Sequence, residues 1–170
     1  MEYLPDVPFA VDERQTLLAL LDLQRSAVTS ICAGCSDDDL RARLVLSPTS
    51  ILGIVKHLAY AERWWFQDNF AGRDVGYPWT DTDPDAEFRI SPDESTRAVL
   101  DFYAAECRTS RDIVAAADLD DRAARRAELS LRWIVGRMIW ETARHAGQAD
   151  ILREQLDGVT GLGHTHPPTL

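Results

Sequence analysis

The chain has 170 residues, of which 45% are hydrophobic and 27% are charged, which is the usual balance of a single soluble domain. Its 18 basic and 28 acidic residues give a net charge of −10, which argues against binding to nucleic acid or to an anionic membrane surface. No run of about 20 apolar residues is present to span a bilayer, and three cysteines cannot form a disulfide framework. The first residues, MEYLPDVPFAVDE, lack a basic start and an apolar stretch, so we expect no secretory signal and a cytoplasmic location.

Four long segments show the spacing of apolar residues that is typical of α-helices. Capping residues mark their ends, since Asp12 precedes the first helix and Gly158 follows the last. The third helix is expected to begin at Ser91-Pro92-Asp93-Glu94, which combines an N-cap, a proline at the first position and acidic residues in the first turn. The predicted helices cover residues 12–33, 50–70, 91–117 and 130–157.

The connectors between these helices are long. Residues 36–49 contain SDDDLRARL, which could form one helical turn. Residues 72–90 are rich in glycine, proline and aspartate and predict an irregular crossover of about 20 residues, a length that is often functional in compact domains. We therefore predict an all-α protein. It would be a four-helix bundle over residues 1–158, with the long crossover between its second and third helices and an irregular tail at 159–170.

The fourth predicted helix carries polar residues in the middle of an apolar stripe. At spacings of three and four, this stripe contains Ile134, Met138, Glu141, His145, Gln148 and Leu152. Burying a carboxylate, an imidazole and an amide without partners is costly, so these groups need hydrogen-bond partners, a cavity or a metal. Glu141 and His145 are four residues apart and can reach one point from consecutive turns.

The second predicted helix offers a third residue for such a site. His57 lies on an apolar stripe and faces the small Ala61, which leaves room beside it. With Glu141 and His145 it would form a set of two histidines and one carboxylate with an open position, the pattern of catalytic zinc, although iron, nickel and manganese also fit. Two alternatives stay open, because a Glu–His pair at this spacing arises by chance and a histidine on an apolar face is often a hydrogen-bonded core residue.

Two stretches, SPTSILGIVKHLAYAERWWF and IWETARHAGQADILREQLDG, resemble the DinB-like (YfiT-like) superfamily, and more narrowly its actinobacterial mycothiol transferase branch. The similarity extends from about Val11 to Gly158. It implies a four-helix bundle with one histidine ligand on the second helix and two ligands on the fourth, around a divalent metal. His57, Glu141 and His145 match that pattern.

One position departs from the pattern of this branch. Relatives commonly have His-x-Gly-His where this chain has His145-Ala146-Gly147-Gln148, so Gln148 replaces a histidine. We expect the triad with Glu141 as a ligand to be intact, and Gln148 to hydrogen-bond a bound water or the substrate.

The resemblance implies a metal-dependent enzyme that joins mycothiol, or a similar small thiol, to an electrophilic small molecule in detoxification or secondary metabolism. The metal, zinc by preference, would favour the reactive thiolate. Tyr60, Trp64, Arg144 and Gln148 are the candidate substrate contacts, although these aromatic residues also fit ordinary packing and Arg144 also fits a solvated helix face. The resemblance also implies a homodimer. A metal-dependent isomerase or hydrolase, or a non-catalytic bundle that binds a small ligand, are the alternatives.

Two further motifs are discounted. The pair Cys32 and Cys35 lies at a helix C-terminus, where the helix dipole raises the pKa of a thiol, and no second pair completes a zinc site. His164 and His166 lie in the tail, where a flexible histidine pair binds metal weakly.

Overall fold

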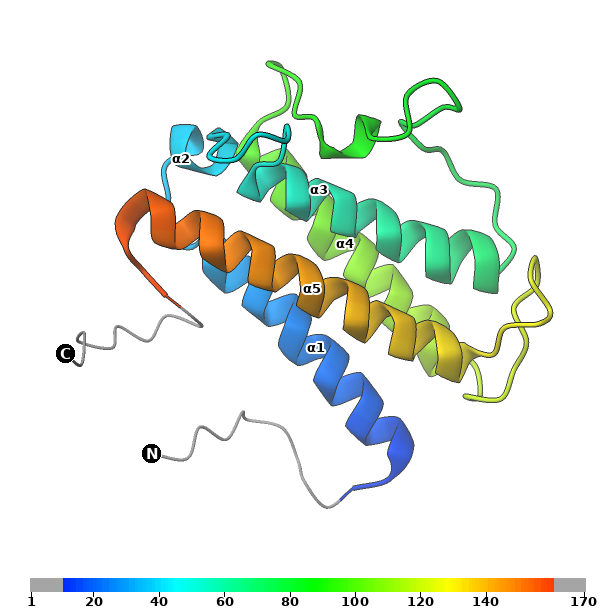
Figure 1. Cartoon of the computed structure of the whole chain (residues 1–170). Coiled ribbons are helices and arrows are strands. Elements are labelled where there is room, and N and C mark those ends of the chain that lie inside the picture. The colour runs from blue at the N-terminus through cyan, green and yellow to red at the C-terminus, as the bar shows by residue number, and fades with distance from the viewer. Residues whose placement is uncertain (1–10, 161–170) are drawn as a thin grey trace.

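The computed structural model describes residues 11–160, and over this range the protein is all-α, as the sequence predicts (Figure 1). Its α-helices are α1 (Glu13–Cys32), α2 (Asp37–Arg41), α3 (Ile51–Glu62), α4 (Thr96–Ala115) and α5 (Leu131–Asp157). The π-helix η1 (Arg63–Phe70) continues α3, and the 3-10 helix η2 (Ala86–Phe88) lies in the crossover. None of the helices in the described range is long and apolar enough to cross a membrane.

Each long helix begins at a side chain that caps its free backbone N–H groups. Asp12 accepts a hydrogen bond from the first turn of α1, and Ser50, Ser95 and Ser130 do the same for α3, α4 and α5. Gly158 ends α5 in the left-handed conformation, with φ of 75°, which glycine adopts without steric cost. The predicted starts of the first, second and fourth helices are therefore confirmed to within one residue.

The predicted start of the third helix at Ser91 is wrong, because α4 begins at Thr96. The side chains that were expected to cap a helix instead close a turn, in which the carboxylate of Glu94 accepts a hydrogen bond from the backbone N–H of Ser91 at 2.8 Å. The same carboxylate accepts from Lys56 of α3 at 2.7 Å. This turn therefore ties the end of the crossover to α3, and Ser95 takes over the capping role.

The predicted second helix is continuous, but its second half is not α-helical. From Arg63 to Phe70 the chain follows π-helical geometry, and the backbone N–H of Ala71 bonds to the carbonyl of Phe66, five residues earlier. The side-chain amide of Asn69 donates to the carbonyl of Trp64 at 2.8 Å and satisfies an acceptor inside this wide turn. Gly72 ends the segment, as expected, with φ of 68°.

The packing of the long helices brings α3 and α5, the second and fourth predicted helices, together. α1 packs along α5, and α3 packs against both α4 and α5 (Figure 1). The crossover returns along α3, with η2 in contact with it (Figure 1). Two apolar clusters fill the interior, one around Leu52, Leu58 and Tyr103 and the other around Phe66 and Met138.

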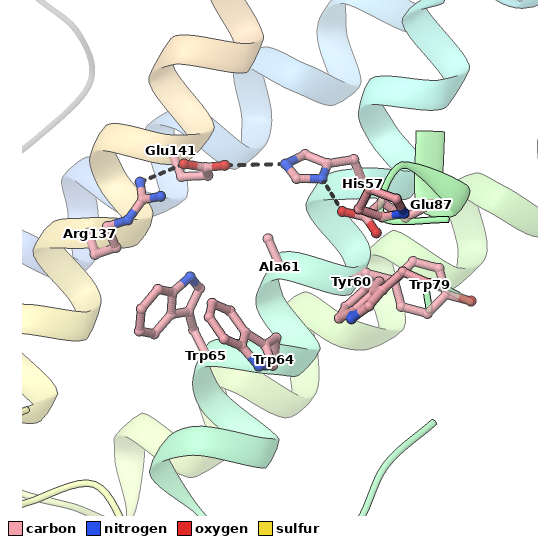
Figure 2. Close-up of a pocket in the computed structure, with 10 residues that line it drawn as sticks. His57, Tyr60, Ala61, Trp64, Trp65, Trp79, Glu87, Arg137 and Glu141 are labelled. Carbon is pink, nitrogen blue, oxygen red and sulfur yellow. Dashed lines mark hydrogen bonds and ion pairs between the residues drawn. The ribbon is translucent and has the colours of Figure 1, made fainter. Parts of the chain in front are cut away.

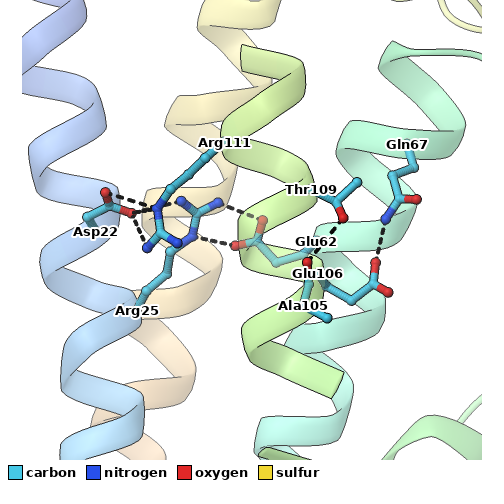
Figure 3. A network of polar contacts seen from close by, with 8 residues as sticks. All are labelled: Asp22, Arg25, Glu62, Gln67, Ala105, Glu106, Thr109 and Arg111. Carbon is cyan, nitrogen blue, oxygen red and sulfur yellow. Dashed lines mark hydrogen bonds and ion pairs between the residues drawn. The ribbon is translucent and has the colours of Figure 1, made fainter. Parts of the chain in front are cut away.

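A buried ion pair connects α1 to α3 (Figure 3). Along both helices it lies between residues of one apolar cluster and residues of the other. Arg25 donates from Nε and Nη2 to the two carboxylate oxygens of Glu62, at 2.8 and 2.7 Å. Asp22 accepts from Nη1 of Arg25 at 2.9 Å and also pairs with Arg111 of α4. The side chains of Arg25 and Glu62 are only 6% and 0% exposed, so each buried charge depends on its partner.

Candidate metal centre

The packing of α3 against α5 brings together the three residues that the sequence nominates as ligands. His57 projects from α3, and Glu141 and His145 project from consecutive turns of α5. Oε1 of Glu141 lies 3.2 Å from Nε2 of His57 and 3.3 Å from Nε2 of His145. The candidate ligand atoms of all three residues lie within 4.8 Å of one another.

This donor set fits a divalent cation. Two imidazole nitrogens and one carboxylate oxygen converge, and their side chains are only 12–14% exposed. Three protein ligands of this kind suit zinc and leave a position for a further ligand, and iron, nickel and manganese accept the same donors.

The electrostatics keep the candidate carboxylate ionised. Hydrogen bonds from His145 and His57, with a further one from Arg137, hold the pKa of Glu141 well below its usual range, although burial opposes them. Burial lowers the pKa of His57, but its hydrogen bonds to Glu141 and Glu87 outweigh that effect and raise the pKa. The carboxylate is therefore in the charged form that metal binding requires.

A residue that the sequence analysis missed completes the surroundings of His57. Oε1 of Glu87, in η2 of the crossover, lies 3.0 Å from Nδ1 of His57 (Figure 2). The next residue, Phe88, stacks on the imidazole with ring centroids 4.2 Å apart and an angle of 13° between the planes. No periodicity marks these positions, and the length of the crossover was their only signal.

An open cavity of about 380 Å³ adjoins the candidate ligands (Figure 2). Its lining includes Tyr60 and Trp64, which the sequence nominates as substrate contacts. Further aromatic and apolar groups complete the wall: Ala61, Trp65, Trp79 and Pro84. His57, Glu87, Arg137 and Glu141 supply its polar part. The cavity therefore combines a wide apolar wall with one cluster of charged groups beside the candidate ligands.

The structure does not bring the other two nominated substrate contacts to this cavity. Arg144 is exposed, and its guanidinium lies 5.9 Å from the ring centroid of Trp140 on the surface of α5. Gln148 is half-buried one turn beyond His145, and neither residue lines the cavity.

The two discounted motifs lie apart from the cavity or outside the described range. Cys32 is buried at the end of α1, and burial raises the pKa of its thiol to about 12, which agrees with an unreactive cysteine. Burial also raises the pKa of Cys35. His164 and His166 lie outside residues 11–160, the part of the chain that the structure describes.

The comparison with protein families agrees with the geometry. A search of curated proteins found no match to the chain. The family model for mycothiol-S-transferase matches residues 16–158, which include all three candidate ligands and every residue that lines the cavity. The chain therefore belongs to the mycothiol-S-transferase family, within the DinB/YfiT-like superfamily.

Proposed function

We propose that the protein is a metal-dependent enzyme that transfers mycothiol to an electrophilic small molecule. The thiol would lose its proton and its sulfur would form a new bond to carbon. In a halide or an activated ring the leaving group would depart as an anion, in an epoxide the C–O bond would open and its oxygen would take up a proton, and in an enone the carbon next to the carbonyl would take up a proton. The observation that carries the proposal is the convergence of His57, Glu141 and His145 beside an aromatic cavity, in a chain of this family.

The residues of the site have separate roles in this proposal. His57, Glu141 and His145 hold a divalent cation, zinc by preference. Such a cation lowers the pKa of a bound thiol and so favours the thiolate, which is the nucleophile. Arg137 keeps one oxygen of Glu141 engaged, and this orients the other oxygen toward the two imidazoles.

The apolar wall positions the electrophile. Tyr60 and Trp64 present aromatic surface to the cavity, and Trp79 approaches Tyr60 edge-on with ring centroids 5.8 Å apart. Aromatic surface of this kind binds flat or apolar groups and excludes water from the reacting atoms. Arg144 and Gln148 have no part in this proposal, because neither lines the cavity.

Membership of the family supports a proposal for the fold and for the location. We propose that α1, α3 with η1, α4 and α5 form the four-helix bundle of the superfamily, and that the enzyme works in the cytoplasm.

Metal analysis of the purified protein, followed by removal and replacement of the metal, tests the centre. We expect about one divalent ion per chain in the wild type and its loss in His145→Ala. Gln148→Ala, one turn further along α5, is the matched control and should keep the metal. A wild-type chain that neither contains nor rebinds a divalent ion contradicts the proposed centre.

Thiol consumption tests the reaction. Mycothiol and 1-chloro-2,4-dinitrobenzene, a neutral aromatic electrophile, are incubated with the metal-loaded enzyme, and glutathione replaces mycothiol in the control. We expect consumption of mycothiol that stops when the metal is chelated. A protein that holds its metal but consumes no mycothiol with a series of halides, epoxides and enones would instead favour a hydrolase or an isomerase.

A further inference from the structure

We propose that Glu87 is a positioning residue for the metal centre, and that the close approach of the crossover to Gly53 holds it in place. This inference rests on the proposed metal site. Among the described residues, the side chain of Glu87 hydrogen-bonds to His57 and not to the other two candidate ligands, so it acts on the centre through His57. Their side chains are 13% and 14% exposed, so water has little access to the contact.

The contact with Glu87 determines which nitrogen of a neutral His57 carries the proton and which one can bind a metal. A carboxylate accepts a hydrogen bond and does not donate one, so an ionised Glu87 requires the proton of a neutral His57 to sit on Nδ1. When a cation displaces the proton from Nε2, the lone pair is then on the nitrogen that faces Glu141 and His145. A carboxylate behind a ligating histidine orients the ring and makes the imidazole a stronger donor to a metal.

The two histidines differ in this respect. Nδ1 of His145 is buried and has no hydrogen-bond partner among the described residues. Oε2 of Glu87 is also buried without a hydrogen-bond partner within residues 11–160, so the one side-chain hydrogen bond of this carboxyl group in that range is to His57. A cation bound to Nε2 of His57 would stabilise this buried carboxylate, and by reciprocity the carboxylate would strengthen binding of the cation.

The crossover contacts α3 through three successive residues, Glu87, Phe88 and Arg89. Phe88 stacks on His57, and the carbonyl of Arg89 accepts a hydrogen bond from Lys56 at 2.9 Å. Gly53 lies beneath the chain at this point, and a Cβ there would overlap the carbonyl oxygen of Phe88 and come within 3.1 Å of Oγ of Ser50. The absence of a side chain at Gly53 therefore sets how closely η2, and with it Glu87, approaches His57.

Zinc affinity, measured by competition with a chromophoric chelator, tests the proposal in the full chain. Glu87→Gln removes the charge and keeps the shape, and Asp85→Asn removes an exposed charge from the same segment as its control. Gly53→Ala displaces the crossover, and Gly136→Ala is its control, because a Cβ at Gly136 meets no atom within 4 Å. We expect Glu87→Gln and Gly53→Ala to weaken zinc binding about 10- to 100-fold and the two controls to leave it unchanged.

Thermal unfolding of the same variants without metal distinguishes positioning from simple tethering of the crossover. Variants of Glu87 that lower the melting temperature but bind zinc as tightly as the wild type would overturn the proposal. If Gly53→Ala does not fold, the comparison of Glu87→Gln with Asp85→Asn decides alone. A wild-type chain that binds no zinc would remove the metal centre itself, a result distinct from equal affinity in all variants.

Discussion

Arg137 donates a hydrogen bond from Nη1 to Oε2 of Glu141, one turn further along α5, and leaves Oε1 of that carboxylate facing both imidazole rings. The guanidinium is itself held from the other side, because its carbon lies 4.3 Å from the ring centroid of Trp140. A carboxylate fixed in this way offers one oxygen to a cation and keeps the other engaged with the protein.

Arg137→Ala should therefore let Glu141 bind a metal through both oxygens. In the cobalt(II)-loaded protein we expect weaker visible absorption than in the wild type, because a higher coordination number weakens these bands. Arg144→Ala removes an exposed arginine two turns further along the same helix and should leave the spectrum unchanged. Identical spectra for both variants and the wild type would show that Arg137 does not control the carboxylate.

Arg25→Ala should destabilise the fold, because it leaves the fully buried carboxylate of Glu62 without its partner. We expect the free energy of unfolding to fall by about 3–5 kcal/mol, measured by urea denaturation of the metal-free protein. The double variant Arg25→Met with Glu62→Leu removes both charges and should recover most of that loss. A double variant as unstable as Arg25→Ala would mean that packing, and not the unpaired charge, causes the effect.

Trp79→Ala should weaken binding of an aromatic electrophile. Trp79 stacks on Tyr77 with ring centroids 4.2 Å apart and lines the cavity from the crossover. Steady-state kinetics should show KM for the electrophile raised about 3- to 10-fold with a smaller change in kcat, since an aromatic contact contributes about 0.5–1.5 kcal/mol. Trp133→Ala removes an indole that is 47% exposed and outside the cavity lining, and should have little effect on KM. Equal KM values for Trp79→Ala and the wild type would place the electrophile elsewhere.

Cys32 should react slowly with iodoacetamide in the native protein. Burial raises the pKa of this thiol to about 12, so almost none is present as thiolate at pH 8. Mass spectrometry after timed alkylation should show modification at Cys32 far slower than in the urea-unfolded chain. Comparable rates in the two states would contradict the assignment of Cys32 as an unreactive core residue.

The helices and the candidate ligands were accessible from the sequence because both depend on local spacing. The interval from Glu141 to His145 fixes their common direction on any α-helix, and capping residues such as Ser130 and Gly158 fix where α5 begins and ends. The association of His57 with this pair depends on which helices pack together, and the resemblance to the family supplied that step.

The site residues that the sequence did not reveal lie outside the helical spacing of apolar residues. Glu87 and Trp79 lie in the irregular crossover, where a residue's direction depends on long-range contacts such as the approach of Phe88 to Gly53. The predicted start of α4 was wrong because Glu94 does not lie in the first turn of a helix. Its carboxylate instead accepts a hydrogen bond from Lys56, a residue 38 positions earlier. Gln148 shares the stripe of Glu141 and His145, but one further turn carries it beyond the cavity, beside the buried Ala149 and Leu152.

The π-helical stretch gives one wall of the cavity an unusual freedom in chain length. A π turn contains about one residue more than an α turn, so one residue can be lost within Arg63–Phe70, with a return to α geometry, while the flanking segments keep their positions. Upstream, His57 belongs to regular α3, and downstream the carbonyl of Phe70 remains bonded to the N–H of Ala124 at 2.9 Å. Between these fixed points, a single-codon deletion would change how Trp64 and Trp65 face the cavity. A deletion in this one turn would therefore alter the surface that faces the substrate without the replacement of any side chain.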